Sequence, residues 1–262
     1  MKNCEEELFS KINEILKNGK RLALCIIVEK IGSGPRDIGT KMVVYNDGKT
    51  MGSIGGGILE RIIIQKALES IKLNKNQLIT LSLGGSEGIE TGLICGGSIK
   101  VFINVINPKP RLIIIGSGHI AKPLAEIAHM VGFEIVILDD SEEEAIREIY
   151  PMASKIIVKP LIQGLEEINL SNGDFVAIVH GEVEKEYDVI KKILERNVEY
   201  IGLLGSRRKG LEFKRRLKDE GFKEEVIEKI NVPIGIDIGA ETPEEIAVSI
   251  VAELIKVLRN KK

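Results

Sequence analysis

The sequence has 262 residues, enough for one large domain or two ordinary ones. Hydrophobic residues make up 44% of it and charged residues 29%, a globular balance that excludes a disordered or fibrous chain. Because 39 acidic residues oppose 37 basic ones, the net charge of -2 draws the protein neither to nucleic acid nor to an anionic membrane.

Cysteine usage and the length of the apolar runs indicate the compartment. Cys4, Cys25 and Cys95 form an odd set without a CxxC pair, and the first residues lack the apolar stretch of a signal peptide. The aliphatic runs at 22–28 and 111–115 are far shorter than the ~20 residues that cross a bilayer. We therefore predict a cytoplasmic protein without a membrane segment.

The first part of the chain alternates glycine clusters with short apolar runs. Helices are predicted over 5–18 and 59–72, and strands over the runs 22–28, 41–45, 78–83 and 99–106, which Gly, Asn or Asp residues bound. The segment Asn107-Pro-Lys-Pro110 stops both kinds of element, because proline fixes φ and lacks an N–H. We expect a glycine-rich α/β domain over 1–106 and a proline-rich linker over 107–110.

From residue 111 onward, strand-like and helix-like segments alternate. The strand-like runs are continuously aliphatic and the helices between them are amphipathic, which is typical of a parallel sheet covered on both faces; the runs are 112–115, 134–138, 156–158, 175–179 and 200–204. The last helix begins with Thr242-Pro-Glu-Glu245, a capping-box pattern. The sequence therefore predicts a Rossmann-type doubly wound domain over 111–262.

A dinucleotide fingerprint follows the first of these strands. Gly116, Gly118 and Ala121 satisfy G-x-G-x-x-G/A at the opening of a helix, and Asp139 or Asp140 ends the next strand. The first glycine allows a tight turn, the second lets a pyrophosphate approach the backbone, and the helix N-terminus attracts the anion. An acid at 139 favours NAD over a 2′-phosphorylated nucleotide.

Two further glycine-rich segments, 32–42 and 52–60, are typical of backbone cradles for an anion, to which Arg36 and Lys41 add positive charge. Glu60 has two readings, a first-turn helix residue stabilised by the helix dipole or a ligand contact. These segments predict an oxyanion-rich ligand.

Cys95 precedes Gly96 and Gly97, which leave space beside its sulfur. The residues alone leave two roles open, a buried small hydrophobe or a functional thiol that ligates a soft metal or carries sulfur.

Polar residues also follow the later strands, where ligands of open α/β sheets bind. Ser206, Arg207 and Lys209 come directly after the run 200–204 and are candidates for a phosphate clamp. His119 and His180 follow the first and fourth strands and are expected at the same edge.

Six segments, in this order and spacing, resemble the XdhC/CoxI family of xanthine dehydrogenase accessory proteins: GSGPRDIGTKM from residue 32, GSIGGGILE from 52, ICGG from 94, GSGHIAKPLA from 116, YIGLLGSRRK from 200 and PIGIDIGAETPEEIAVSIVAE from 233. The resemblance implies a homodimeric chaperone that binds molybdenum cofactor (molybdopterin), protects its sulfurated form and helps insert it into a xanthine dehydrogenase-like molybdenum hydroxylase. It also implies a cysteine desulfurase as the sulfur source.

The candidate site residues combine the resemblance with the fingerprint. A metal contact is expected at Cys95, and the candidate cofactor-binding residues are Arg36, Lys41, Gly55, Gly56, Gly57, Glu60, Cys95, Gly96, Gly97, Gly116, Gly118, His119, Ala121, Asp139, Ser206, Arg207 and Lys209. No catalytic residue is assigned. The alternatives are an NAD(P)-dependent oxidoreductase and an NAD-sensing accessory module, both using the Rossmann domain.

Overall fold

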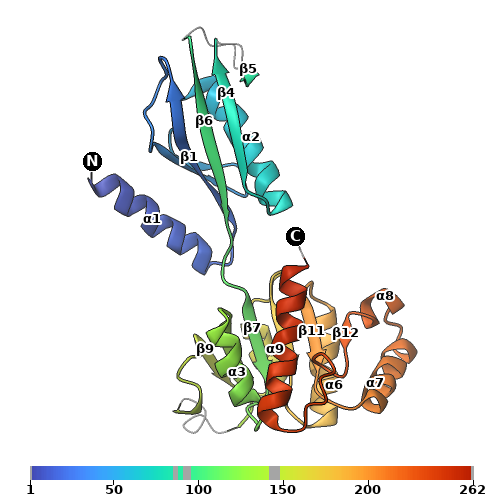
Figure 1. Cartoon of the computed structure of the whole chain (residues 1–262). Helices are drawn as coiled ribbons and strands as arrows, with labels where there is room; N and C mark the ends of the chain where they lie inside the picture. The colour runs from blue at the N-terminus through green and yellow to red at the C-terminus, as the bar shows by residue number, and fades with distance from the viewer. Residues whose placement is uncertain (1, 85–87, 91–95, 142–147, 261–262) are drawn as a thin grey trace. The chain divides into compact units, whose positions relative to one another are not determined.

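The computed structural model describes residues 2–84, 88–90, 96–141 and 148–260. The chain divides between Pro108 and Lys109 into two compact units, each of which is described by itself (Figure 1). Each unit contains a six-stranded sheet with helices packed on it, so the predicted α/β class is confirmed.

The N-terminal sheet has the order β3-β2-β1-β6-β4-β5. Its strand pairs are antiparallel except β4 with β5, and the bounds are β1 (Leu22–Ile31), β2 (Lys41–Tyr45), β3 (Thr50–Gly52), β4 (Gln77–Leu83), β5 (Ile89–Glu90) and β6 (Gly97–Ile106). Because β1 and β6 pair over nearly their whole length, the segments that follow β1 and precede β6 lie at the same end of the sheet.

Two helices cover the two faces of this sheet. Alternate side chains of a strand point to opposite faces, so Leu22 and Leu24 pack with α1 (Lys2–Lys17) on one side. On the other side, Ala23, Cys25 and Ile27 pack with α2 (Gly57–Leu73). The unit thus has a small and a large hydrophobic cluster, one on each face of the sheet.

The C-terminal sheet has the order β12-β11-β10-β7-β8-β9, and all its strand pairs are parallel. Its strands are β7 (Arg111–Ile115), β8 (Glu134–Asp139), β9 (Lys155–Val158), β10 (Phe175–Ile178), β11 (Tyr200–Leu203) and β12 (Ile230–Asn231). Numbered within the unit, this is the order 3-2-1-4-5-6 of a Rossmann fold. The strand order reverses between β7 and β10, where such folds bind ligands.

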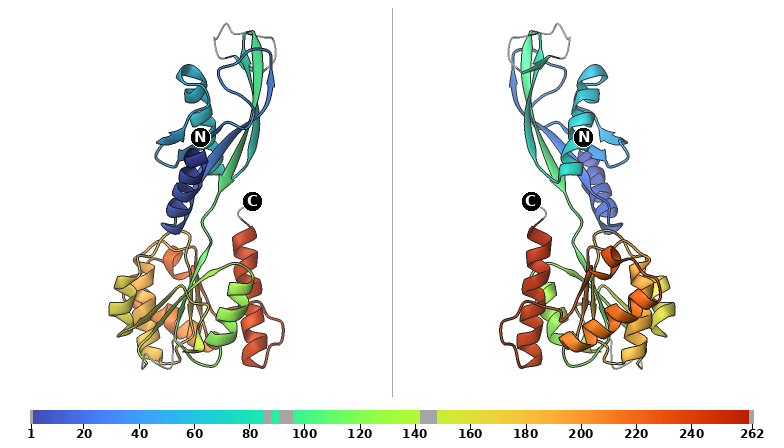
Figure 2. Two further views of the ribbon diagram at one scale, coloured as in Figure 1. Left: turned by 90° about the vertical axis from the view of Figure 1, so that its left-hand side faces the viewer. Right: turned by 90° about the vertical axis from the view of Figure 1, so that its right-hand side faces the viewer.

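Helices cover both faces of the C-terminal sheet, as Figure 2 shows. One face packs against α3 (Ala121–Met130) and α9 (Pro243–Arg259). The other packs against α5 (Leu161–Glu167), α6 (Val183–Leu194), α7 (Arg207–Asp219) and α8 (Glu224–Ile227). The capping box of α9 is present, with Thr242 Oγ1 accepting from the Glu245 N–H and the Glu245 carboxylate accepting from the Thr242 N–H.

Among the amphipathic helices predicted between the strands, the one over 142–149 lies largely outside the described residues. In the part of the chain that is described, none of the helices is both long and apolar enough to span a bilayer.

Candidate functional site

The glycine-rich turns of the N-terminal unit meet at one end of its sheet. A Cβ on Gly97 would lie 2.4 Å from the Ile31 carbonyl oxygen, and one on Gly32 would lie 2.9 Å from that of Gly96. A Cβ on Gly55 would lie 2.5 Å from Cγ of Pro35. The segment 32–42 therefore contacts both of the other glycine motifs, and glycine is required where these backbones pack together.

Glu60 accepts hydrogen bonds from two amides and one hydroxyl of the 52–57 turn. Its Oε1 accepts from the Ser53 hydroxyl at 2.6 Å, the Gly56 N–H at 2.9 Å and the Ile54 N–H at 3.1 Å. Partial burial raises the pKa of Glu60, but these hydrogen bonds outweigh it, so the pKa lies below its ordinary value. The carboxylate is thus an internal anion that holds the turn at the start of α2.

We expect Glu60→Gln to lower the free energy of unfolding by about 1 kcal/mol at pH 7, a value that allows for the partial exposure of the carboxylate. Because the folded-state pKa is depressed, this stabilisation is fully present above the unfolded pKa, near 4.5, and disappears as the pH falls through the folded-state value. Urea denaturation at pH 7 and at acidic pH measures both effects.

Glu69→Gln is the matched control, because Glu69 lies on the same helix and, within the described ranges, pairs with Lys66 alone at the surface. Two results would contradict this role of Glu60. In one, Glu60→Gln lowers the free energy of unfolding as much in acid as at pH 7; in the other, it lowers it no more than Glu69→Gln does.

Donors remain at this end of the sheet. Arg36 is exposed, and no hydrogen bond or ion pair engages it among the described residues. A Cβ on Gly56, Gly57 or Gly96 would meet no atom within 4 Å, and no side chain caps α2. Lys41 differs, because its ammonium binds the Glu5 carboxylate at 2.5 Å and the Gly39 carbonyl at 3.1 Å. Cys95, directly before Gly96, lies outside the described residues.

In the C-terminal unit, the fingerprint residues have the geometry that their spacing predicts. Gly116 has φ 108°, and a Cβ there would lie 2.5 Å from Cα of His180, so β7 and β10 are held close at the point where the strand order reverses. A Cβ on Gly118 would meet nothing within 4 Å, which leaves its backbone accessible to a ligand. Ala121 is buried at the start of α3, whereas His119 is exposed.

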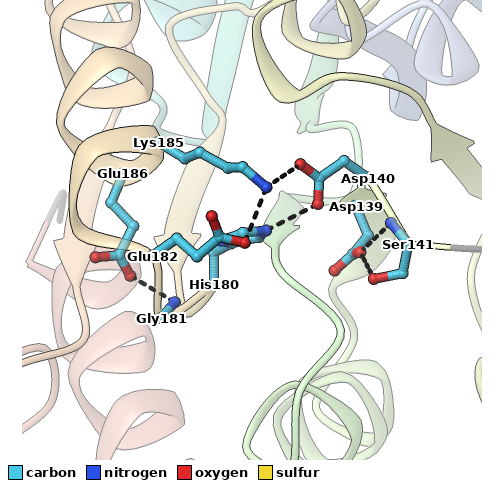
Figure 3. A network of polar contacts seen from close by, with 8 residues as sticks. All are labelled: Asp139, Asp140, Ser141, His180, Gly181, Glu182, Lys185 and Glu186. Carbon is cyan, nitrogen blue, oxygen red and sulfur yellow. Dashed lines mark hydrogen bonds and ion pairs between the residues drawn. The ribbon is translucent and has the colours of Figure 1, made fainter.

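Side chains from the ends of β8 and β10 join across the end of β7 (Figure 3). Nε2 of His180 lies 3.0 Å from Oδ1 of Asp140, and the Lys185 ammonium lies 2.7 Å from its Oδ2. Burial opposes ionisation of Asp140, but the hydrogen bonds from Lys185 and His180 prevail and lower its pKa. A ligand that reaches the Gly116–Gly118 turn would meet this polar bridge.

Asp139, the predicted ribose partner, is 2% exposed and points back to its own loop. Its Oδ1 accepts from the Ser141 N–H at 2.7 Å and from the Ser141 hydroxyl. Asp139, Asp140 and His180 bring one potential metal ligand each within 4.8 Å of one another. Lys185 supplies one positive charge beside the two carboxylates of this group.

A buried ion pair connects the loops after β10 and β11. Glu186 is fully buried; one carboxylate oxygen accepts from the Gly181 N–H at 2.9 Å and the other binds the Lys209 ammonium. Lys209 also donates to the Leu204 carbonyl at 3.0 Å. Ser206 caps α7 through the Lys209 N–H. Arg207 is exposed, and its guanidinium lies 3.9 Å from the Asp237 carboxylate. Of the two cations in the predicted phosphate clamp, Lys209 is paired with Glu186, and Arg207 is the more available for a ligand.

Comparison with known proteins identifies the family. The model of the XdhC Rossmann domain matches residues 112–254, and that of the XdhC and CoxI family matches residues 15–83. The chain belongs to the XdhC and CoxI family. The resemblance drawn from the six sequence segments is thereby confirmed, and the XdhC Rossmann match covers the unit whose strand order is that of a Rossmann fold.

Three curated proteins are similar to this chain. This chain is 33% identical to the uncharacterized protein YqeB of Escherichia coli, and the alignment covers 97% of this chain and 46% of YqeB. It is 35% identical to a probable xanthine dehydrogenase subunit of Bacillus subtilis, over 60% of this chain and 46% of that protein. The chain thus spans about half the length of these two relatives.

The third relative aligns over nearly its whole length. The molybdenum cofactor insertion chaperone PaoD of Escherichia coli is 24% identical, over 93% of this chain and 86% of PaoD. Among solved structures, a xanthine dehydrogenase from Bacillus halodurans matches with a TM-score of 0.54 and 23% sequence identity. The match covers 95% of this chain and 96% of the Bacillus halodurans chain. This likeness shows that the two chains share a fold.

Proposed function

We propose that this chain is an accessory protein that binds molybdenum cofactor and helps insert it into a xanthine dehydrogenase-like molybdenum hydroxylase. The observation that carries the proposal is the match to a molybdenum cofactor insertion chaperone over 93% of this chain and 86% of that protein. The second support is chemical. The cofactor is an anionic, polar pterin, and a carrier needs cations and backbone donors for it.

The converging turns of the N-terminal unit supply such donors. Arg36 offers a guanidinium that no residue of the described chain engages, and the first turn of α2 presents uncapped amides. A Cβ at Gly57 or Gly96 would meet no atom within 4 Å, so the cofactor has room to approach the backbone there. In this proposal the turns hold the phosphate end, while Glu60 and Lys41, which are bound within the protein, maintain the shape of the site.

The finer steps are part of the same proposal. The protein holds the sulfurated cofactor as a cytoplasmic homodimer, and a cysteine desulfurase supplies the sulfur. Cys95 is the thiol assigned to the molybdenum end, either as a ligand or as a sulfur carrier. The NAD(P) predicted from the Gly116–Gly118 turn stays a prediction, as do the oxidoreductase and NAD-sensing alternatives.

The test is anaerobic loading with molybdenum cofactor, followed by gel filtration, quantitation of molybdenum and pterin fluorescence after oxidative release. Wild-type protein is expected to retain both components. Arg36→Ala should reduce retention about tenfold, because a charge-assisted hydrogen bond to phosphate is lost. Arg21→Ala is the matched control, since Arg21 precedes β1 and Arg36 follows it, at opposite ends of that strand.

Wild-type protein that retains neither pterin nor molybdenum would refute the proposed function. Equal losses in the two arginine variants would refute the assigned turns. If Cys95→Ala retains and transfers the cofactor as well as wild type, the thiol has no part in it.

A further inference from the structure

A cavity of about 470 Å³ lies in the C-terminal unit beside the carboxyl end of β11. Its walls come from the turn between β11 and α7, from the loop over 233–240 and from α9. Two sequence motifs singled out above, 200–209 and 233–253, therefore meet at one place. The proposed function places the molybdenum cofactor on the N-terminal turns and assigns no ligand to either of these two motifs.

The walls are mainly aliphatic and held in place by hydrogen bonds. Leu204, Ile234 and Ile246 line the cavity. The loop is anchored where the Gly235 N–H donates to Oε2 of Glu253 at 2.8 Å, and the same oxygen accepts from the Tyr200 hydroxyl. A pre-formed space of this size with aliphatic side chains in its lining suits a small ring system, because little ordering is needed on binding.

A hydroxyl faces the same space. Ser249 lines the cavity, and the residue is 6% exposed. The hydroxyl oxygen lies toward Gly235, where a Cβ would be only 2.2 Å away. A hydroxyl can both donate and accept a hydrogen bond, so Ser249 can bond a polar atom of a ligand in this cavity.

Positive charge lies at the rim. Arg207 lines the cavity, and its side chain is 83% exposed; its contact with Asp237 at 3.9 Å is long and faces solvent, so it holds the guanidinium weakly. Arg207 is also the first residue of the 13-residue helix α7, and the cap at Ser206 uses the N–H of Lys209 only. A helix N-terminus and a guanidinium together favour a phosphate group.

We propose that this cavity binds a nucleoside monophosphate. The ring packs between the aliphatic walls, Ser249 bonds a polar atom of the ring, and the phosphate lies on Arg207 and the first turn of α7. The residues that line the site are neither those of the N-terminal turns nor those of the Gly116–Gly118 turn after β7. It goes beyond the proposed function and can fail or succeed independently of it.

The test is isothermal titration calorimetry of the full chain with AMP, CMP, GMP and UMP. At least one is expected to bind with a Kd below about 1 mM, and to bind more tightly than inorganic phosphate or its own nucleoside, since both ends of the ligand contribute. Arg207→Ala should weaken binding about tenfold or more. Arg208→Ala, the exposed neighbour that does not line the cavity, should leave it within about twofold.

Two further variants should change the binding affinity in opposite directions. Asp237→Asn should tighten binding, because it removes the carboxylate that competes for Arg207, whereas Ala240→Phe should abolish binding by filling the cavity. Thermal unfolding checks that each variant folds.

Three results would overturn the proposal. None of the four nucleotides binds at about 10 mM, or the Arg207 and Arg208 variants lose affinity equally. The third is that only Gly118→Val removes binding, which would place the ligand on the fingerprint.

Discussion

Replacing Glu186 with alanine is expected to destabilise the C-terminal unit by about 3 kcal/mol. The side chain is fully buried, and its loss leaves the largely buried Lys209 ammonium without its carboxylate and the Gly181 N–H without its acceptor. Removing one partner of such a pair costs far more than the pair contributes, because a charge remains in a poorly solvated place. Urea denaturation of the full chain, followed by circular dichroism, measures the effect.

Glu184→Ala is the matched control. Glu184 lies on the same helix and pairs with Arg216, but its side chain is 74% exposed, so water replaces the lost contact and the change should be far smaller. In Glu186→Ala, hydrogen exchange should also increase at Gly181 and in the turn before α7, because both loops lose their shared anchor. Equal destabilisation by the two variants would show that the buried pair is not the anchor.

Cys25 is expected to resist alkylation in the folded protein. The thiol lies on β1 within the hydrophobic cluster beneath α2, and burial raises its pKa to about 12. Compared with an ordinary cysteine, its thiolate population at pH 8 falls by about a thousandfold, before steric protection is counted. Iodoacetamide labelling with peptide mass spectrometry measures the rate in buffer and in guanidinium.

The unfolded chain is the control, because every cysteine is accessible there and should react at the ordinary rate. Folded-state labelling of Cys25 at a rate similar to that in guanidinium would contradict the buried position. If the rate is low, Cys25 is excluded as a carrier of sulfur or as a ligand of the cargo, and any such chemistry must use another thiol.

Much of the fold could be predicted from local patterns. The predicted strand over 41–45 is observed with those bounds, because its apolar residues end at turn-forming residues on one side and at glycine and threonine on the other. The start of α9 was visible because the capping box is a local pattern. The strands β3, β5 and β12 have only two or three residues, too few to establish a periodicity, and only the paired sheet reveals them.

The candidate site was harder to predict because its contacts join distant residues. The spacing of Gly116, Gly118 and Ala121 is local and predicted the turn after β7. Nothing local indicates that the ammonium of Lys209 reaches Glu186, which lies 23 residues away. Glu186 itself carried one signal, since it lies four residues before the buried Ile190 on the same helix face, where an acid needs a partner.

The short strands at the margins of both sheets bear on how the protein meets other molecules. The outermost strands are β3 and β5 in one sheet and β9 and β12 in the other, and as described they have two to four residues each. Such borders present few free backbone groups to an incoming strand, which discourages uncontrolled polymerisation. A second copy or a client enzyme would therefore have to be recognised through side chains and loops, and mutational searches for those contacts should begin there.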